Sequence, residues 1–343
     1  MEIQNPAAHV PTVLTYKSLD LEWYNEVARV FWKLHYAQEA HDTLANCLDY
    51  IDHLTSFQEI SKGSLEVRLC ELMNSYYRLA STLERDCGNF AEAYKYANES
   101  LQLANAMGNS PYALQIAAAS QYTRGVASLA WGVFGDQVKQ GRVYLRREKI
   151  KAALTDFEQA LWHASPELKG IVYSEMARAK ALTCISPTDM TIALKLMEQA
   201  EPFVNEGSSG DFYTHILVNG DIKGLDKRRL ILGRAKMFLA MERPARVIEE
   251  LDRLEMLKDG STHTRRRAWT SILYAQASFK LGDYSTAADE AIKAFYDSQS
   301  VRAVAHMARI RELYAILRTS PHRENTRVKQ LGMLIDMIFF KEK

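Results

Sequence analysis

The sequence predicts an all-α protein, a right-handed solenoid of about six stacked helix pairs that ends in a C-terminal capping helix pair. A glycine turn followed by alanines at helical spacing occurs several times, most clearly at Gly282 with Ala287 and at Gly88 with Ala93. The pattern returns with a period of about 34 residues, which is typical of helix-turn-helix repeats. Proline (8) and glycine (16) are few in a chain of 343 residues, which permits long helices.

The spacing within each pair resembles that of the tetratricopeptide repeat. In that repeat a small residue on the first helix lets the second helix approach closely, and an alanine on the second helix lies at the crossing point. Here Tyr24, Ala28 and Phe31 form one helical stripe that is expected to face Leu44 and Cys47. The resemblance covers nearly the whole chain and implies a protein that holds a partner. Its motif residues are packing residues, so they indicate a fold and not a ligand.

The repeats can be followed in order along one domain, residues 1–343. An N-terminal extension, residues 1–20, precedes the repeats in residues 21–298. In the third unit the first helix begins near residue 113 and continues, with a break at residues 132–135, to about residue 147, so we expect roughly one extra helix there. In the fourth unit Ser186 is expected to cap the second helix. The first, second, fourth, fifth and sixth units cover, in that order, residues 21–51, 65–104, 168–203, 226–257 and 263–297.

Residues 205–224 interrupt the repeat pattern. This segment is rich in Gly, Ser, Asn and Asp around a short apolar piece, which is typical of a loop. Because an interruption of about 20 residues inside a repeat array is uncommon, it is a candidate for a mobile or binding element. The alternative is an insertion that an exposed turn tolerates.

Residues 300–340 are expected to form two capping helices, because the open end of an array must be covered by an element with a polar outer face. They also resemble the C-terminal end of the tetratricopeptide sensor region of many bacterial Xre-type transcription regulators. Those proteins usually carry a helix-turn-helix DNA-binding domain before the array, whereas only about 20 residues precede it here. The resemblance therefore implies a sensor region without that domain. It rests on residues 311–318, Ser320, Pro321, Val328, Leu331 and Leu334.

Composition argues against several other classes of protein. A net charge of +1 gives no electrostatic reason to expect direct nucleic-acid binding. The cysteines Cys47, Cys70, Cys87 and Cys184 are irregularly spaced without a histidine set beside them, so we expect small buried residues and no zinc site. The first 15 residues lack the pattern of a secretory signal, and no apolar run reaches about 18 residues. We therefore expect a soluble cytoplasmic protein.

Catalytic motifs are absent from the sequence. It contains no Gly-x-x-x-x-Gly-Lys-Ser/Thr, Gly-x-Gly-x-x-Gly, Gly-x-Ser-x-Gly or His-Glu-x-x-His pattern. His35 and His41 are six residues apart and so lie on different faces of a helix. We expect no catalytic residues, no cofactor, no metal site and no enzymatic activity.

The candidate binding surface is the concave face, which the first helix of each pair lines in such solenoids. Five of six units place a basic residue at a groove-facing position, in a chain that is nearly neutral. Because the arginine fork binds carboxylate or phosphate at two points, this pattern predicts a basic groove for an acidic or C-terminal peptide segment. The alternative is that these charges solvate a helix face or pair with Glu22, Glu26 and Glu175. The predicted groove residues are Asn25, Arg29, Trp32, Arg78, Thr82, Arg142, Arg178, Arg229, Lys236, Trp269 and Gln276.

Two basic triplets begin predicted first helices, at residues 227–229 and 265–267. Positive charge at the start of a helix is unfavourable because it opposes the helix dipole. Basic residues at such a position can therefore indicate a binding role, for example contact with phosphates.

Two functional hypotheses follow. The first is a protein- or peptide-binding scaffold with an acidic partner, and a homodimer is compatible with it. The second is a bacterial sensor module in which a peptide or small ligand changes the superhelix. A closed, narrow groove with the loop of residues 205–224 folded across it would favour the sensor, and an open one the scaffold.

Overall fold

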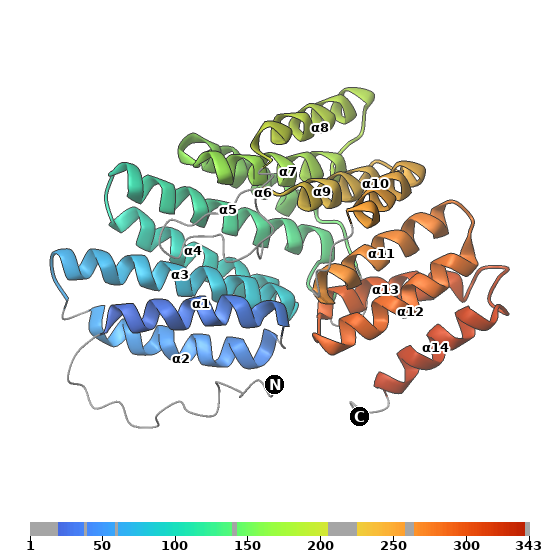
Figure 1. The fold of residues 1–343 in the computed structure, drawn as a ribbon, viewed down its shortest axis with the longest axis horizontal. Helices are drawn as coiled ribbons and strands as arrows, with labels where there is room; N and C mark the ends of the chain where they lie inside the picture. Colours follow the sequence, from blue (N-terminus) through green and yellow to red (C-terminus); the bar gives the residue numbers. More distant parts are fainter. Residues whose placement is uncertain are drawn as a thin grey trace.

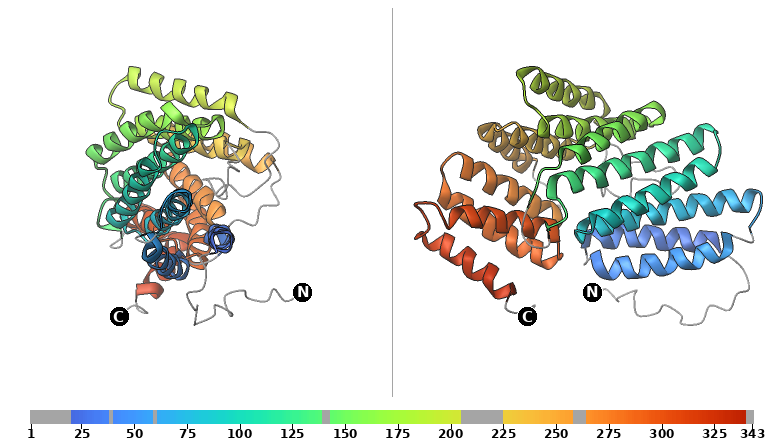
Figure 2. Two further views of the ribbon diagram at one scale, coloured as in Figure 1. Left: turned by 90° about the vertical axis from the view of Figure 1, so that its left-hand side faces the viewer. Right: turned by 180° about the vertical axis from the view of Figure 1, so that it is seen from behind.

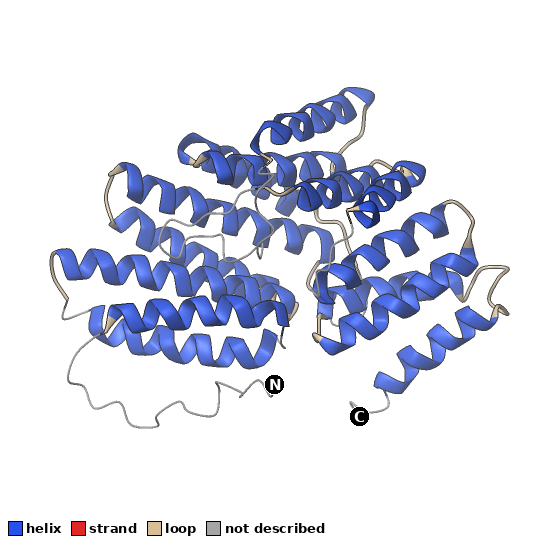
Figure 3. Ribbon diagram, viewed as in Figure 1, coloured by secondary structure: helices blue, strands red, loops and turns tan. Residues whose placement is uncertain are grey.

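The computed structural model describes residues 20–37, 40–58, 61–138, 143–204, 225–257 and 264–339. These residues form fourteen α-helices and one short 3₁₀ helix, and no strand occurs among them (Figure 3). The helices are α1 (Leu21–Ala37), α2 (Ala40–Gln58), α3 (Ser64–Asp86), α4 (Phe90–Ala106), α5 (Pro111–Phe134), α6 (Arg147–His163), α7 (Pro166–Leu182), α8 (Pro187–Ala200), η3 (Glu201–Phe203), α9 (Lys227–Ala240), α10 (Pro244–Met256), α11 (Thr264–Lys280), α12 (Tyr284–Ser300), α13 (Val304–Leu317) and α14 (Thr326–Phe339).

The helices pack as consecutive antiparallel pairs, from α1 with α2 to α13 with α14 (Figure 1). The first helices of the pairs also contact one another in an unbroken series, α1 to α3, α5, α7, α9, α11 and α13. The second helices lie outside this inner row. The predicted all-α, repeat-like arrangement of helix pairs is therefore confirmed.

Small residues at the helix crossings explain the close pairing. Ala28, Ala93, Ala153 and Ala287 have no exposed surface. A side chain in place of Gly125 on α5 would overlap the ring of Phe157 on α6. Since interiors pack at crystal-like density, such positions exclude larger residues.

The predicted helix boundaries are confirmed at several turns. Gly88 and Gly282 have φ angles of 79° and 84°, a left-handed conformation that favours glycine. Ser186 caps α8: its hydroxyl accepts from the backbone N–H of Asp189, whose carboxylate in turn accepts from the Ser186 N–H.

In the third unit α5 ends at the break expected near residues 132–135, but the extra helix expected after that break is not found among the described residues. Helix α5 ends at Phe134 because Gly135 adopts φ 68°, and residues 143–146 are not helical. The third unit is thus an ordinary pair, α5 with α6, joined by a longer connection.

The array curves until its two ends meet, so that α1–α4 lie beside α11–α14 (Figures 1 and 2). Asp86 on α3 pairs with Arg265 on α11 at 2.8 Å. Behind this pair, a Cβ at Gly88 would stand 3.1 Å from Val304 on α13, and the guanidinium of Arg309 lies over the ring of Phe134. We call these contacts the seam. The seam joins the two ends of the curved array beside its concave face.

Several predictions fall at or beyond the described residues. The extension 1–20 is described only at Asp20, and the 205–224 segment lies wholly outside the described residues.

The cysteines only partly match the expectation that they are buried. Cys47 and Cys70 are buried as expected, while Cys87 and Cys184 are half-buried, and all four are free thiols. None of the described helices is both long and apolar enough to cross a membrane.

Candidate anion-binding cavity

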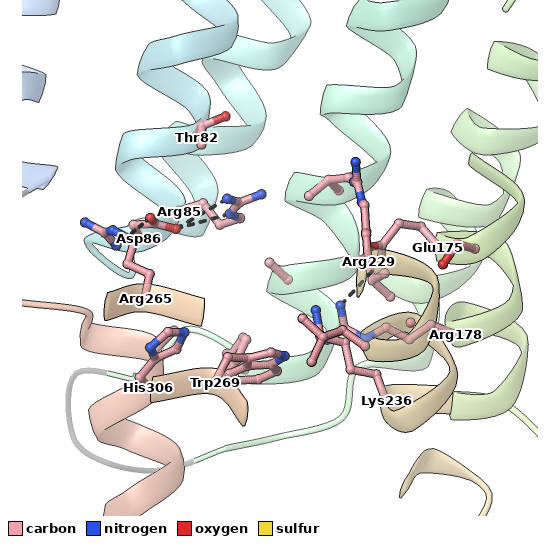
Figure 4. A pocket seen from close by; sticks show the side chains of 18 of the residues that line it. Thr82, Arg85, Asp86, Glu175, Arg178, Arg229, Lys236, Arg265, Trp269 and His306 are labelled. Atoms are coloured by element: carbon pink, nitrogen blue, oxygen red, sulfur yellow. Dashed lines mark hydrogen bonds and ion pairs between the residues drawn. The ribbon is translucent and has the colours of Figure 1, made fainter. Parts of the chain in front are cut away.

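A cavity of about 260 Å³ lies on the concave side of the array (Figure 4). Its wall comes from the first helices of six pairs, α3, α5, α7, α9, α11 and α13, with Phe90 added from α4. It extends across the seam, because α3 and α5 approach it from one end of the chain and α11 and α13 from the other. Neither half of the protein could form this cavity alone.

The wall carries more positive than negative charge. Among the described residues five arginines and one lysine line the cavity, against two carboxylates. Since the whole chain has a net charge of only +1, this excess is local. Low-dielectric walls of one charge sign focus an electrostatic potential and attract ions of the opposite sign. The cations are Arg85, Arg178, Arg229, Lys236, Arg265 and Arg266, and the carboxylates are Asp86 and Glu175.

Helix ends of both signs reach the cavity. Arg229 lies in the first turn of α9, Arg265 and Arg266 in the first turn of α11, and His306 in the first turn of α13. The N-terminal turn of a helix carries a partial positive charge and N–H groups without helical partners, which favours anions. The last turns of α3 and α5, at Asp86 and Phe134, bring partial negative charge to the same wall and oppose this effect.

The α7–α9 side of the cavity holds Glu175, Arg178, Arg229 and Lys236. Arg178 pairs with Glu175 at 3.4 Å, and Arg229 donates to the hydroxyl of Tyr122 at 3.1 Å. Burial alone would raise the pKa of Glu175, but Arg178, Lys236 and Arg229 together bring it below its usual value. Glu175 is therefore ionised and compensates part of the cationic charge.

Lys236 is the most perturbed cation in the wall. Burial, followed by repulsion from Arg178, lowers its pKa to about 7, and Arg229 and Arg85 act in the same direction. The attraction of Glu175 offsets this only in part. Among the described residues no carboxylate lies within ion-pair distance of its ammonium group, which sits 5.2 Å from the ring centre of Trp269. Such a strongly perturbed group in a cavity marks a candidate functional site.

The α3–α11 side holds Arg85, Asp86 and Arg265. Asp86 accepts from both arginines, at 3.4 Å from Arg85 and 2.8 Å from Arg265. Beside them burial lowers the pKa of His306 to about 3: the nearby Asp86 favours the charged imidazolium, whereas Arg265, Lys236 and Arg85 oppose it. His306 is therefore neutral at physiological pH.

Trp269 lies between the two sides. Its ring stacks on that of His306 with centroids 5.1 Å apart, and Lys236 approaches it from α9. The indole Nε1 is buried and makes no hydrogen bond to the described residues. A buried donor left unpaired costs about 1–3 kcal/mol, so an acceptor here would be stabilising.

Gly233 sets the distance between α7 and α9. A Cβ at this position would overlap the hydroxyl oxygen of Ser174. The absence of a side chain lets the two helices approach, which brings Lys236 and Arg229 on α9 near Glu175 and Arg178 on α7.

The structure brings five of the eleven predicted groove residues together in the cavity wall: Thr82, Arg178, Arg229, Lys236 and Trp269. The remaining described ones lie elsewhere. Trp32 and Arg78 are buried in the core, each with 1% of its surface exposed. Asn25, Arg29 and Gln276 are half-buried outside the cavity wall, and Arg29 pairs with Glu26. Arg142 lies outside the described residues.

Sequence reasoning missed part of the cavity wall. Arg85 and Asp86 lie one helical turn beyond Thr82, so they share its face, but a fixed repeat register does not include them. Arg265 and Arg266 belong to one of the two basic triplets noted in the sequence, and Arg229 belongs to the other. His306 lies in the expected cap, and only the closing of the seam brings it here.

Among the described residues no cluster of three His, Cys, Asp or Glu side chains could hold a metal ion. Comparison with known proteins adds no assignment: no family model matches the chain, and no curated protein matches it in sequence.

Proposed function

We propose that this chain is a non-enzymatic, right-handed solenoid of the tetratricopeptide type that senses a small anionic ligand bound in its central cavity. The observation that carries the proposal is the local excess of cations, six against two carboxylates, around a single cavity in a nearly neutral protein. Maintaining that excess costs free energy, as the lowered pKa of Lys236 indicates. An anion beside Lys236 would offset the part of this cost that its burial and the neighbouring arginines cause.

The size of the cavity favours a small ligand over an extended protein segment. Pockets for drug-sized ligands span about 300–1,000 Å³, and this cavity of about 260 Å³ is slightly smaller. The contacts of the seam join the two ends of the array beside the concave face, which shortens the groove available to an extended peptide. A scaffold that binds an acidic segment stays the second candidate, because the arginine forks of Arg178 and Arg229 would also accept a terminal carboxylate.

A sensing role is supported by the position of the cavity across the seam. A ligand held by both α3 and α11 would stabilise the closed array, and a ligand shifts a conformational equilibrium by its differential affinity for the two states. Small rotations between helix pairs then move the ends of the array. A bacterial regulator is one setting in which such a change would be used.

The proposal is tested by isothermal titration calorimetry with citrate, inorganic phosphate and a short acidic peptide at low and high salt. We expect at least one of these anions to bind wild type, with affinity that falls as salt screens the charges. Lys236→Met and Arg178→Gln should abolish that binding. The matched control Lys293→Met removes an exposed lysine on α12, paired with Glu290, and should bind as wild type does.

Two results would contradict the proposal. One is that no anion binds at millimolar concentration. The other is that binding persists unchanged in both cavity variants while their circular dichroism spectra show a native fold. If the acidic peptide alone binds, the scaffold replaces the small-ligand sensor.

A further inference from the structure

The cavity wall has an apolar part as well as a charged one. Among the described residues, its arginines, its lysine and its carboxylates all belong to α3, α7, α9 and α11, and α5 contributes no charged side chain. Helix α5 nevertheless supplies more of the described wall residues than any other helix. A ligand in the cavity therefore meets an uncharged surface too. The wall residues of α5 are Tyr122, Thr123, Val126, Leu129, Ala130 and Phe134.

One face of α5 forms this surface. From Val126 onward its wall residues are apolar and recur at the spacing of a helical stripe, over about two turns or about 12 Å. Leu129 and Phe134 are buried, while Val126 and Ala130, one turn apart, are only half-buried. Arg124, on the same helix, pairs instead with a carboxylate of α6 at 2.6 Å. The stripe is thus an apolar wall that a ligand can cover.

The apolar wall continues onto the neighbouring helices. Phe90 on α4 and Leu232 on α9 also line the cavity, and the ring of Phe90 stacks on that of Phe134 with centroids 5.8 Å apart. Covering such a surface removes it from water and is favourable in proportion to the area covered. An inorganic anion has no apolar atoms with which to do this. A ligand gains affinity here only through a hydrocarbon part.

Two donors beside each other suit an acidic group. The indole Nε1 of Trp269 is buried and makes no hydrogen bond to the described residues. The ammonium of Lys236 lies 5.2 Å from the ring centre of the same indole, and Figure 4 shows Trp269 between His306 and Lys236. A carboxylate has two acceptor oxygens, so one carboxylate can accept from both groups.

The donors and the apolar wall are neighbours. Trp269, Val126 and Ala130 all pack against the same apolar cluster of the core. One turn before Val126, the hydroxyl of Tyr122 accepts from Arg229 on α9 at 3.1 Å, so α9, which carries Lys236, reaches α5 at the start of the apolar stripe. A cavity of about 150 Å³ already holds a benzene molecule. The 260 Å³ present here therefore accommodate a ring or a short alkyl chain together with an acidic group.

We propose that the cavity binds a small organic acid, with its carboxylate between Lys236 and the indole Nε1 of Trp269 and its apolar body against Val126 and Ala130. This inference rests on the proposed function and names the chemical class of its anion. A short aliphatic acid and an arylacetic acid share this chemistry.

The experiment measures affinities of the full-length protein by calorimetry, at constant pH and ionic strength, for acetate, hexanoate, phenylacetate, hexanamide and inorganic phosphate. Hexanoate or phenylacetate should bind at least about tenfold more tightly than acetate, since one fully buried methylene raises affinity up to about fourfold. Hexanamide keeps the chain but lacks the charge, and should bind at least about tenfold more weakly than hexanoate. Tighter binding of hexanoate indicates an aliphatic ligand and tighter binding of phenylacetate an aromatic one, and both support the inference.

Variants of the apolar wall provide the second readout. Val126→Thr keeps the shape of the side chain but adds a hydroxyl, and Ala130→Leu fills the space beside it, so both should lower the preference for hexanoate over acetate several-fold. Acetate is too short to cover the wall, so its unchanged affinity shows that a variant is folded. The matched control Val67→Thr makes the same exchange at an exposed position of α3 outside the cavity and should keep the wild-type preference.

Three outcomes overturn the inference. If acetate or phosphate binds as tightly as hexanoate and phenylacetate, and Lys236→Met abolishes that binding, the apolar body is wrong while the anion-sensing function stands. If hexanamide binds as tightly as hexanoate, the cavity does not recognise an acid, and the inference and the anion-sensing function both fail. If none of these anions binds, nor citrate or the acidic peptide, while wild type is folded by circular dichroism, the proposed function itself fails.

Discussion

Asp86, the last residue of α3, and Arg265, in the first turn of α11, form an ion pair of 2.8 Å although 179 residues separate them. Their side chains are only 18% and 11% exposed. Arg265 also donates to the backbone carbonyl of Val301. The pair therefore ties the N-terminal half of the array to the C-terminal half at the edge of the cavity.

Breaking this pair should open the seam. Asp86→Ala leaves Arg265 largely buried beside Arg85 without their shared carboxylate, and we expect a loss of about 2 kcal/mol in the free energy of unfolding, measured by urea denaturation. Small-angle X-ray scattering should show a larger radius of gyration. Glu249→Ala, which removes an exposed partner of Arg246 on α10, is the control and should cost less than about 0.5 kcal/mol. An equal loss in both variants would contradict the role of the seam.

The turn at Gly88 should tolerate a side chain less well than the turn at Gly282. Both glycines have positive φ, so alanine costs about 1–2 kcal/mol at either position. At Gly88 the new Cβ also stands 3.0 Å from Val138 and 3.1 Å from Val304, while at Gly282 nothing lies within 4 Å. We expect Gly88→Ala to lower the melting temperature several degrees more than Gly282→Ala. Equal shifts would mean that the seam is not tightly packed.

Gly233 and Ser174 should behave as a coupled pair. Gly233→Ala overlaps the Ser174 hydroxyl, pushes α7 from α9 and should weaken anion binding at least about tenfold. Ser174→Ala removes the overlapping oxygen, because the Ser174 Cβ stands 3.8 Å away, so the double variant should regain both stability and binding. Thermal unfolding and calorimetry on the four proteins of the cycle check this. Additive effects would contradict direct contact.

Lys236 should reduce stability in the absence of a ligand. In the unfolded chain it holds its proton up to a pKa near 10.5, whereas in the folded protein it releases the proton near pH 7. Between these values the unfolded state binds more protons, so stability rises with pH, and the destabilisation is complete below pH 7. Lys236→Met should therefore raise the free energy of unfolding by about 1–3 kcal/mol at pH 6 and by less at pH 9. Urea titrations at both values test this, and an equal gain at both would contradict it.

Anion binding should favour the protonated form of Lys236. Wild-type affinity is expected to fall above pH 7 relative to that of Lys236→Arg, which stays charged; the comparison cancels titration of the ligand itself. The charged groups that act on Lys236 are Arg178, Glu175, Arg229 and Arg85. Glu175 stays ionised across this range, because its pKa lies below its usual value, and His306 stays neutral. Calorimetry in buffers of different ionisation enthalpy should show proton uptake near neutral pH. A constant ratio of affinities between pH 6 and pH 9 would exclude this lysine from the site.

The helix pairs could be predicted because their signals are local. Gly282 with Ala287, Gly88 with Ala93 and the Ser186 cap each act within one turn or one crossing, which short spacings encode. In the third unit the left-handed Gly135 ends α5 at the expected break, whereas the extra helix expected beyond it is not found among the described residues, of which 143–146 are not helical.

The sequence by itself determined the all-α class, the order of the helix pairs and the concentration of basic residues on first helices. Only the tertiary structure decided which of those residues meet. The curvature of the array accumulates from small rotations between seven helix pairs, and no single repeat encodes the total rotation. That rotation brings Asp86 to Arg265, encloses Lys236 beside Trp269 and leaves Trp32 and Arg78 in the core.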